Sequence, residues 1–246
     1  MSESAATATR PMSLMGPESQ ELTNELAVLT RMLPFDGASL LELGCGGAEK
    51  TRLIANKTSV ARIVAAEVDS IQHEKNLKVT DLDKVSFEAF GAEEIPYPDD
   101  TFDIVVMFKS LHHVPLDRLD DAMAEIHRVL KPGGYAYISE PVFDGAFNHV
   151  MRVFHDEEVV RREAFSAVGR AVERELFELA EEYFFRNRIR FESWQQYETN
   201  MLSVTHTEHN LSDEQRAEVE RRFEANRSDE GYVFDIPNRV DLLRKA

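Results

Sequence analysis

The chain has little that would support a secreted, disulfide-bonded or membrane-spanning protein. It contains one cysteine, Cys45, in 246 residues, so no internal disulfide can form and a zinc site built from several cysteines is excluded. No apolar run approaches the roughly 18 to 20 residues that span a bilayer. The N-terminal residues lack the basic start and apolar stretch of a secretory signal. We therefore expect a cytoplasmic protein with no membrane partner.

Positive charge is also scarce. The chain has 28 lysines and arginines against 45 aspartates and glutamates, which gives a formal net charge of −17. Such a surface repels phosphate backbones and gains little from counterion release. We therefore expect no nucleic-acid partner. The charge serves mainly to keep the protein soluble.

Short apolar runs alternate with helical patterns over the first 140 residues. The β-like runs are residues 39–43, 62–66, 85–90, 102–108 and 135–139. Helical patterns cover residues 18–33, 48–56, 69–78 and 116–130. Strands that alternate with helices predict an α/β fold with a Rossmann-like, doubly wound and mostly parallel sheet, in which ligands bind beyond the carboxyl ends of the strands.

The domain organisation follows from where this alternation stops. Residues 1–17 are small, polar and proline-containing, and are interpreted as a flexible N-terminus. Residues 18–246 are expected to form one domain, with a core of residues 18–140 and 231–246. Residues 141–230 are charged and aromatic-rich, and we expect a helical cap inserted after the fifth strand. Its aromatic side chains could line an acceptor pocket or complete the hydrophobic core.

The clearest chemical signal is the segment LLELGCGGAE, residues 40–49. An apolar strand runs into three glycines and then a helix, and glycines allow a sharp turn and a close approach of a ligand to the backbone. Glu42 precedes the turn, where a phosphate-binding loop would avoid negative charge. Glu49 stands where a dinucleotide-binding fingerprint has its third glycine. The loop therefore suits a cationic or polar ligand and disfavours a nicotinamide-dependent oxidoreductase.

A second acidic residue follows the next strand. Glu67 lies about 20 residues beyond the glycine turn, the distance at which a carboxylate meets ribose hydroxyls in nucleoside-binding folds. A carboxylate there can accept hydrogen bonds from both hydroxyls. Asp69 is the competing candidate, although it fits better as the N-cap of the following helix.

Five segments in register resemble the class I methyltransferases that use S-adenosylmethionine (SAM). They are LLELGCGGAE, AAEVD, GAEEIPYPDDTFDIVV, LHHVP and EIHRVLKPGGYAYISEP, within residues 38–141. The resemblance implies a seven-stranded-type sheet, SAM as cofactor and S-adenosylhomocysteine as product. The cofactor-binding positions that it implies are Glu42, Gly44, Cys45, Gly46, Glu67, Val68, Ala92, Glu93, Phe108 and Lys109.

One position departs from the family pattern. Members of the family usually carry an aspartate at the position of Gly91, where it binds the adenine amine. Here Glu93 or a backbone carbonyl has to take that role.

Candidate residues for proton transfer follow the fourth strand. They are His113, His112 and Lys109. Histidine titrates near neutral pH and can accept a proton from a protonated acceptor, and a lysine at the end of this strand can anchor a carboxylate. We expect no metal ion at the site.

The sequence favours methyl transfer to a small molecule with an oxygen, nitrogen or sulfur nucleophile. An RNA- or protein-directed methyltransferase and a non-catalytic SAM-binding protein remain alternatives. The oligomeric state stays open between a monomer and a homodimer.

Overall fold

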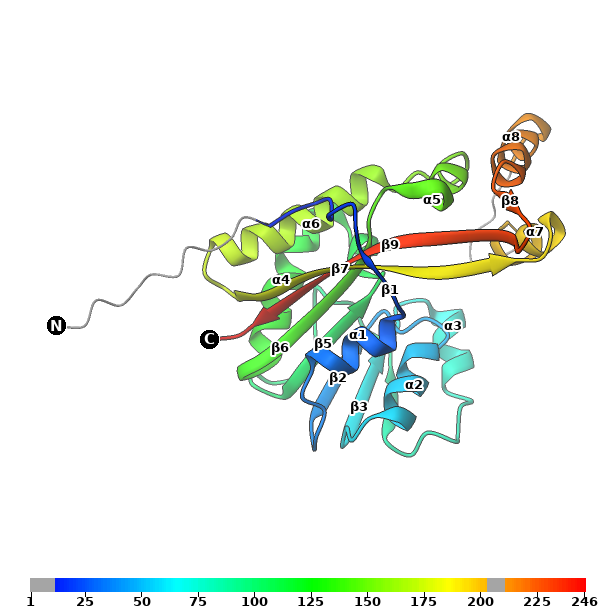
Figure 1. Cartoon of the computed structure of the whole chain (residues 1–246). Coiled ribbons are helices and arrows are strands. Elements are labelled where there is room, and N and C mark those ends of the chain that lie inside the picture. The colour runs from blue at the N-terminus through cyan, green and yellow to red at the C-terminus, as the bar shows by residue number, and fades with distance from the viewer. Residues whose placement is uncertain (1–11, 203–210) are drawn as a thin grey trace.

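The computed structural model describes residues 12–202 and 211–246, which form one mixed sheet with helices on both faces (Figure 1). Its strands are β1 (Glu21–Leu22), β2 (Ser39–Leu43), β3 (Arg62–Ala66), β4 (Val85–Glu88), β5 (Phe102–Phe108), β6 (Leu130–Pro141), β7 (Glu178–Phe191), β8 (Arg227–Ser228) and β9 (Gly231–Arg244). The helices are α1 (Glu25–Met32), α2 (Glu49–Lys57), α3 (Ser70–Asn76), α4 (Leu119–Val129), α5 (Gly145–Met151), α6 (Glu158–Glu173), α7 (Trp194–Met201) and α8 (Asp213–Glu224). Two 3-10 turns, η1 (Leu111–His113) and η2 (Leu116–Arg118), follow β5.

The strand order is β1-β7-β9-β6-β5-β2-β3-β4, with β8 paired to β9. Strands β4, β3, β2, β5 and β6 are parallel to one another, whereas β9 runs antiparallel to both β6 and β7. The order reverses at β2, so the carboxyl ends of β2 and its neighbours form the switch point where ligands bind in such sheets. The predicted Rossmann-like, mostly parallel α/β fold is confirmed.

Alternating side chains of the central strands pack against helices on opposite faces. Leu41 and Leu43 join one buried cluster with residues of α4 and α6, while Leu40 joins another with residues of α1 and α2. This period of two follows from the pleat of the strand. A strand covered on both faces is apolar throughout, which explains the uninterrupted FDIVVMF run of β5.

The first helix begins later than the sequence pattern indicated. The prediction of a helix that begins at residue 18 was wrong, because residues 21–22 form a strand that pairs with β7 and the helix starts at Glu25. Asn24 determines this start, since its side-chain oxygen accepts the backbone N–H of Ala27 at 3.0 Å. Of the expected flexible N-terminus, residues 1–11 lie outside the described residues. The backbone N–H of Ser13 donates to Glu182 at 2.6 Å.

The region predicted as a helical cap also contains a strand. Residues 178–191 form β7, which pairs with β9 along its length and adds an outer strand to the sheet. The helical interpretation was wrong for this segment, because a neighbouring strand far along the chain satisfies its backbone. The division of the chain into core and cap otherwise stays a prediction.

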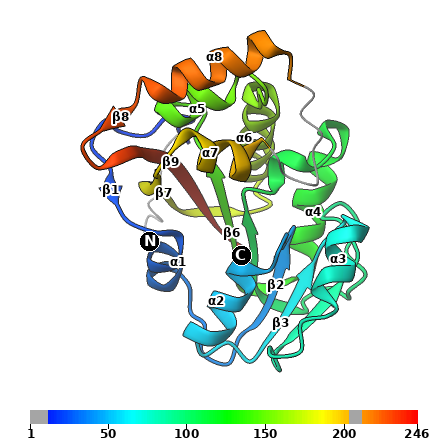
Figure 2. The same ribbon diagram turned by 90° about the vertical axis from the view of Figure 1, so that its right-hand side faces the viewer.

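Three of the cap helices, α5, α7 and α8, gather at one end of β7 and β9. Figure 2 shows α5, α7 and α8 together there, away from β2 and β3. They bury a third hydrophobic cluster whose fully buried rings include Tyr197, Phe223 and Phe234. The aromatic side chains of this region therefore mainly complete a core. Within the described residues, no helix is long and apolar enough to cross a membrane.

Candidate cofactor and acceptor site

A cavity of about 1020 Å³ opens at the carboxyl ends of β2, β3 and β5. Its size suits a ligand such as a nucleoside joined to an amino acid. The lining comes from the N-terminal part of the chain, between residues 25 and 115. Among the described residues, none between 141 and 230 lines it, so the described part of the cap does not supply the pocket wall that its aromatic content suggested.

The turn after β2 presents backbone to the cavity. The N–H groups of Gly44 and Cys45 both donate to the carbonyl of Ala66, each at 2.9 Å. Gly44 has φ +72°, and a Cβ there would lie 2.6 Å from the Cβ of Ser110. Gly46 has φ +50°, and a Cβ there would meet no protein atom within 4 Å. The positive φ of Gly46 favours glycine, and the missing side chain leaves space for a ligand to approach the backbone.

Glu67 lies at the end of β3 and faces the same cavity. One carboxylate oxygen accepts the N–H of Gly46 at 2.7 Å, and the other accepts the N–H of Asp69 at 2.9 Å. Each oxygen keeps a lone pair for a further donor. The backbone thus fixes a carboxylate in a geometry that suits two ribose hydroxyls. Asp69 caps α3 through the N–H groups of Ile71 and Gln72, as the sequence predicted.

Glu42 is a buried carboxyl beneath the glycine turn. Thr51 donates its hydroxyl to Glu42 at 2.7 Å, yet burial raises the pKa of Glu42 to about 7. A bound cation would favour its ionised form. Cys45 is buried beside it, and burial with the nearby Glu42 and Glu67 carboxylates raises the pKa of this thiol to about 12. The thiol is therefore protonated and unreactive at neutral pH.

The loop after β4 brings Ala92 and Glu93 to the cavity. The carboxylate of Glu93 occupies the space into which a side chain at Gly91 would project. The acidic group missing from position 91 is therefore replaced in space by the side chain two residues later. This arrangement fits the role that the resemblance left to Glu93.

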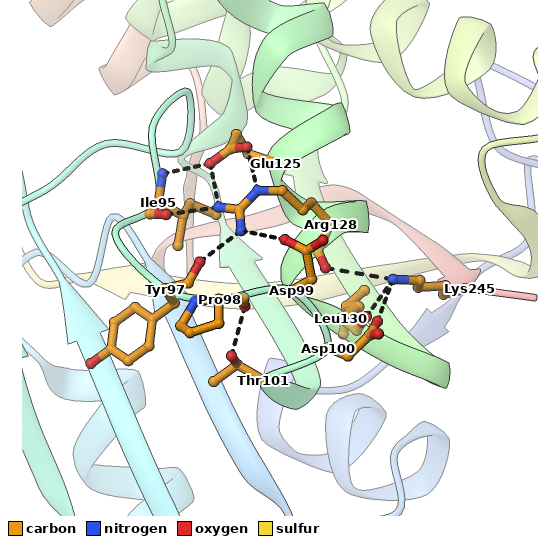
Figure 3. Close-up of polar contacts among 10 residues, drawn as sticks. All are labelled: Ile95, Tyr97, Pro98, Asp99, Asp100, Thr101, Glu125, Arg128, Leu130 and Lys245. Atoms are coloured by element: carbon orange, nitrogen blue, oxygen red, sulfur yellow. Dashed lines mark hydrogen bonds and ion pairs between the residues drawn. The ribbon is translucent and has the colours of Figure 1, made fainter.

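Arg128 of α4 forms hydrogen bonds with the backbone of this loop (Figure 3). Its guanidinium donates to the carbonyls of Ile95 and Tyr97, at 2.8 and 2.6 Å. It also pairs with Glu125, which in turn accepts the N–H of Ile95 at 2.8 Å. Charged hydrogen bonds of this kind are stronger than neutral ones. They hold the loop that carries Glu93 against the sheet.

Lys109 has an unusual backbone at the end of β5. Its φ is +56°, a conformation that few non-glycine residues adopt and that clusters at functional sites. Its side chain is accessible from the cavity, but the surrounding protein still lowers the pKa of its ammonium group through desolvation. Glu25 of α1 lines the same cavity and accepts the hydroxyls of Tyr137 and Ser139, at 2.7 and 3.0 Å.

The two adjacent histidines have opposite environments. His113 is exposed and lines the cavity, and desolvation together with His112 lowers its pKa. His112 is buried and does not line the cavity. Although burial by itself lowers the pKa of His112, hydrogen bonds and charge from Glu140 and Glu157 raise it to about 9. A histidine that is already protonated and enclosed is poorly suited to accept a proton from a substrate.

All ten cofactor-binding positions indicated by the sequence lie along this one cavity, and so does His113. Their binding roles stay predictions. Sequence reasoning missed Glu25, Lys50 and Ser110, which also line it. Glu25 lies on a helix outside the recognisable motifs, and only the packing of α1 brings it to the strand ends. It likewise missed that Glu157, from the start of the cap, approaches His112 and His113.

Comparisons with known proteins agree with this geometry. Residues 41–138 match the family model described as a methyltransferase domain. A 27-O-demethylrifamycin SV methyltransferase from Amycolatopsis mediterranei is 39% identical over 117 residues. Methyltransferase GfsG from Streptomyces halstedii is 36% identical over 118 residues. Each match covers 46% of this chain and only 41% of the relative, so the chain spans well under half of either protein.

Residues 41–138 resemble the methyltransferase domain of SAM-dependent methyltransferases. A methyltransferase candidate of solved structure from Bacillus halodurans has the same fold, with a TM-score of 0.61 at 21% identity. That match covers 90% of this chain and 98% of the other. The fold likeness therefore extends beyond the motif-bearing half of the chain, into the region where the sequence match ends. SAM is the cofactor that this family uses.

Proposed function

We propose that the chain transfers a methyl group from SAM to an oxygen, nitrogen or sulfur nucleophile of a small molecule. One observation carries the proposal: the ten positions that the motifs indicate for the cofactor converge on a single cavity at the carboxyl ends of β2, β3 and β5. The relatives support the substrate class, since one is named for methylating a rifamycin derivative. The acidic chain, with a net charge of −17, disfavours an RNA acceptor.

The residues of the cavity fit the parts of this cofactor. Glu67 would accept the ribose hydroxyls, and Glu93 would face the adenine amine. The turn at residues 44–46 would hold the methionyl end, with Glu42 near its positive charge. When bound, SAM supplies an electrophilic methyl group on a sulfonium.

The chain's own contribution at the reacting end is alignment. Phe108, Lys109 and His113 lie at or just after the end of β5, which is separated by β2 from the strand β3 that precedes Glu67. Methyl transfer is an in-line displacement, so fixing the acceptor against the methyl group provides much of the rate enhancement. Lys109 would hold a carboxylate of the cofactor or of the acceptor.

The proposal is tested by thermal unfolding of the purified chain with SAM, S-adenosylhomocysteine and NAD in parallel. A ligand at about 100 times its Kd stabilises the fold by about 2.7 kcal/mol. We expect a clear rise in Tm with either SAM species and none with NAD. If neither SAM species shifts the transition, the proposed function is wrong. A shift with SAM would justify screening small hydroxyl, amine and thiol compounds by release of S-adenosylhomocysteine.

A further inference from the structure

Beside the proposed acceptor end of the cavity lies a partly buried cluster of histidines and carboxylates. His112 and His113 come from turn η1, and Glu157 from the residue before α6. One donor atom of each residue lies within 4.8 Å of the donor atoms of the other two. His112 and Glu157 are both buried, whereas His113 is exposed toward the cavity. The cluster therefore joins the cap to the acceptor end of the cofactor site.

The hydrogen bonds of His112 define which ring nitrogen is available. Its Nδ1 contacts Glu140 of β6, a carboxylate that also accepts the N–H of Leu111 at 2.9 Å. A carboxylate only accepts, so Nδ1 carries a proton and Nε2 is left to face Glu157. The distance from Nε2 to the nearer Glu157 oxygen is 3.3 Å. A bare lone pair and a carboxylate at this distance would repel each other, so a cation lies between them: the second proton of a protonated His112, or a metal ion that takes the place of that proton.

The carboxylate of Glu157 is fixed from its other side. Arg161, one turn further along α6, binds the oxygen that is remote from His112. His155 donates its Nε2 hydrogen to the nearer oxygen at 2.8 Å. That nearer oxygen retains one lone pair. Glu157 is thus oriented to bind a cation through a single oxygen.

We propose that His112, His113 and Glu157 bind a divalent first-row transition-metal ion such as Zn²⁺. Two imidazoles and one carboxylate are a ligand set that such ions prefer. With bonds of about 2.0 to 2.1 Å, two ligands of a tetrahedral ion are roughly 3.3 to 3.5 Å apart, which matches the 3.3 Å between His112 and Glu157. Glu140 and Arg161 are the outer partners that orient the ligands of a metal site.

Closing the cluster onto one ion requires a small movement. Two ligands of a tetrahedral ion lie roughly 3.3 to 3.5 Å apart, so a donor that is 4.8 Å from another must move by roughly 1.3 Å. His113 can provide this movement, because its side chain is exposed at the cavity. No metal was expected from the sequence, because Glu157 lies more than forty residues after the two adjacent histidines.

Three protein ligands leave a fourth position open, as in catalytic zinc sites. Since His113 lines the cofactor cavity, this position faces the acceptor end. It would bind an oxygen or nitrogen atom of the acceptor and polarise it. This role rests on the proposed function, whereas binding of the ion does not.

The test measures metal binding directly on the full chain. Protein treated with EDTA and then dialysed is titrated with Zn²⁺ by calorimetry, and with Co²⁺ while its d–d absorption is followed. We expect one ion per chain and a cobalt spectrum typical of a site with nitrogen and oxygen ligands. His113→Ala and Glu157→Gln should each weaken Zn²⁺ binding by at least tenfold, and Glu140→Gln should weaken it by about 10- to 100-fold.

His149→Ala is the matched control, because this histidine is exposed and lies outside the cluster. It should leave Zn²⁺ affinity unchanged. His113→Ala is the decisive variant, since losing an exposed side chain should not impair folding, which circular dichroism checks. If Zn²⁺ does not bind, or binds equally to the wild type and to both the His113→Ala and Glu157→Gln variants, the metal site is wrong. His112 is then a protonated bridge between two carboxylates.

The same preparation separates this proposal from the proposed function. Glu157 does not line the cofactor cavity, so Glu157→Gln should keep the Tm rise with SAM while losing Zn²⁺. Zinc binding without any SAM response would support the metal site and overturn methyl transfer. A rise in Tm with SAM but no zinc binding would support the proposed function and overturn the metal site.

Discussion

The cofactor half of the chain and the cap are built in different ways. Around β2, β3 and β5, short strands end in turns whose side chains and N–H groups face a cavity. Around α5, α7 and α8, aromatic rings such as Tyr197 and Phe223 fill a separate small core at the end of β7 and β9. The first region gathers polar groups at strand ends around a cavity, and the second uses apolar area for stability. An aromatic-rich segment therefore need not line a pocket, even beside an active site.

The largest expected effect is a loss of stability from a substitution in the core of the cap. Phe223 is fully buried among the rings of the cap, so Phe223→Ala should lower the free energy of unfolding by about 3 to 5 kcal/mol. The Kd for SAM should change little. Urea unfolding and SAM titration measure the two quantities. Val159→Ala, at a half-exposed position of α6, is the control and should stay within about 0.5 kcal/mol. A loss of SAM affinity without loss of stability would contradict the contrast.

A substitution in the cofactor half should mainly weaken SAM binding, in contrast to the loss of stability expected in the cap. Glu67→Ala removes the carboxylate proposed for the ribose hydroxyls, and should weaken SAM binding by about 1.5 to 3 kcal/mol. Calorimetric titration with SAM measures the change. Glu74→Ala provides a comparison, because Glu74 is exposed on α3 and does not line the cavity. Unchanged affinity in Glu67→Ala would refute the ribose assignment.

A pH dependence of SAM binding is expected from Glu42. Burial raises its pKa to about 7, so the side chain is mostly neutral at pH 6 and mostly ionised at pH 8. Only the ionised form attracts the positive charge of the methionyl end. The affinity for SAM should therefore rise by about tenfold, or 1.4 kcal/mol, over this interval. Glu42→Gln should flatten the profile. An equal pH dependence in wild type and variant would assign the titration to another group.

The smallest expected effect concerns the adenine side. Glu93→Ala should weaken SAM binding by about 0.5 to 1.5 kcal/mol, the value of one hydrogen bond. Glu93→Gln should retain most of the affinity, because an amide oxygen can still accept from the adenine amine. Titrating SAM into each protein variant in the same binding assay is sensitive enough to separate the two substitutions. If both behave as wild type, a backbone carbonyl binds the amine.

Much of the cofactor site could be predicted because its signals are local. The turn at residues 44–46 and the acid at Glu67 each follow an apolar strand, and parallel strands place their carboxyl ends at one edge. The predicted boundaries of β2, β3 and β5 agree with the structure for the same reason. The start of α1 and the strand β7 were mispredicted, since pairing with distant segments decides both.

By itself, the sequence determined the fold class, the resemblance to methyltransferases and the positions that line the cavity, because these depend on strand-length patterns and on turns of a few residues. Tertiary structure alone decided that Glu25 reaches the cavity, that Glu93 fills the space beside Gly91, and that His112 is buried while His113 is accessible. It also brought Glu157 to the histidines across more than forty residues of chain. Packing brings distant side chains together, and burial then sets their protonation and their chemistry. Neither can be deduced from spacing along the chain.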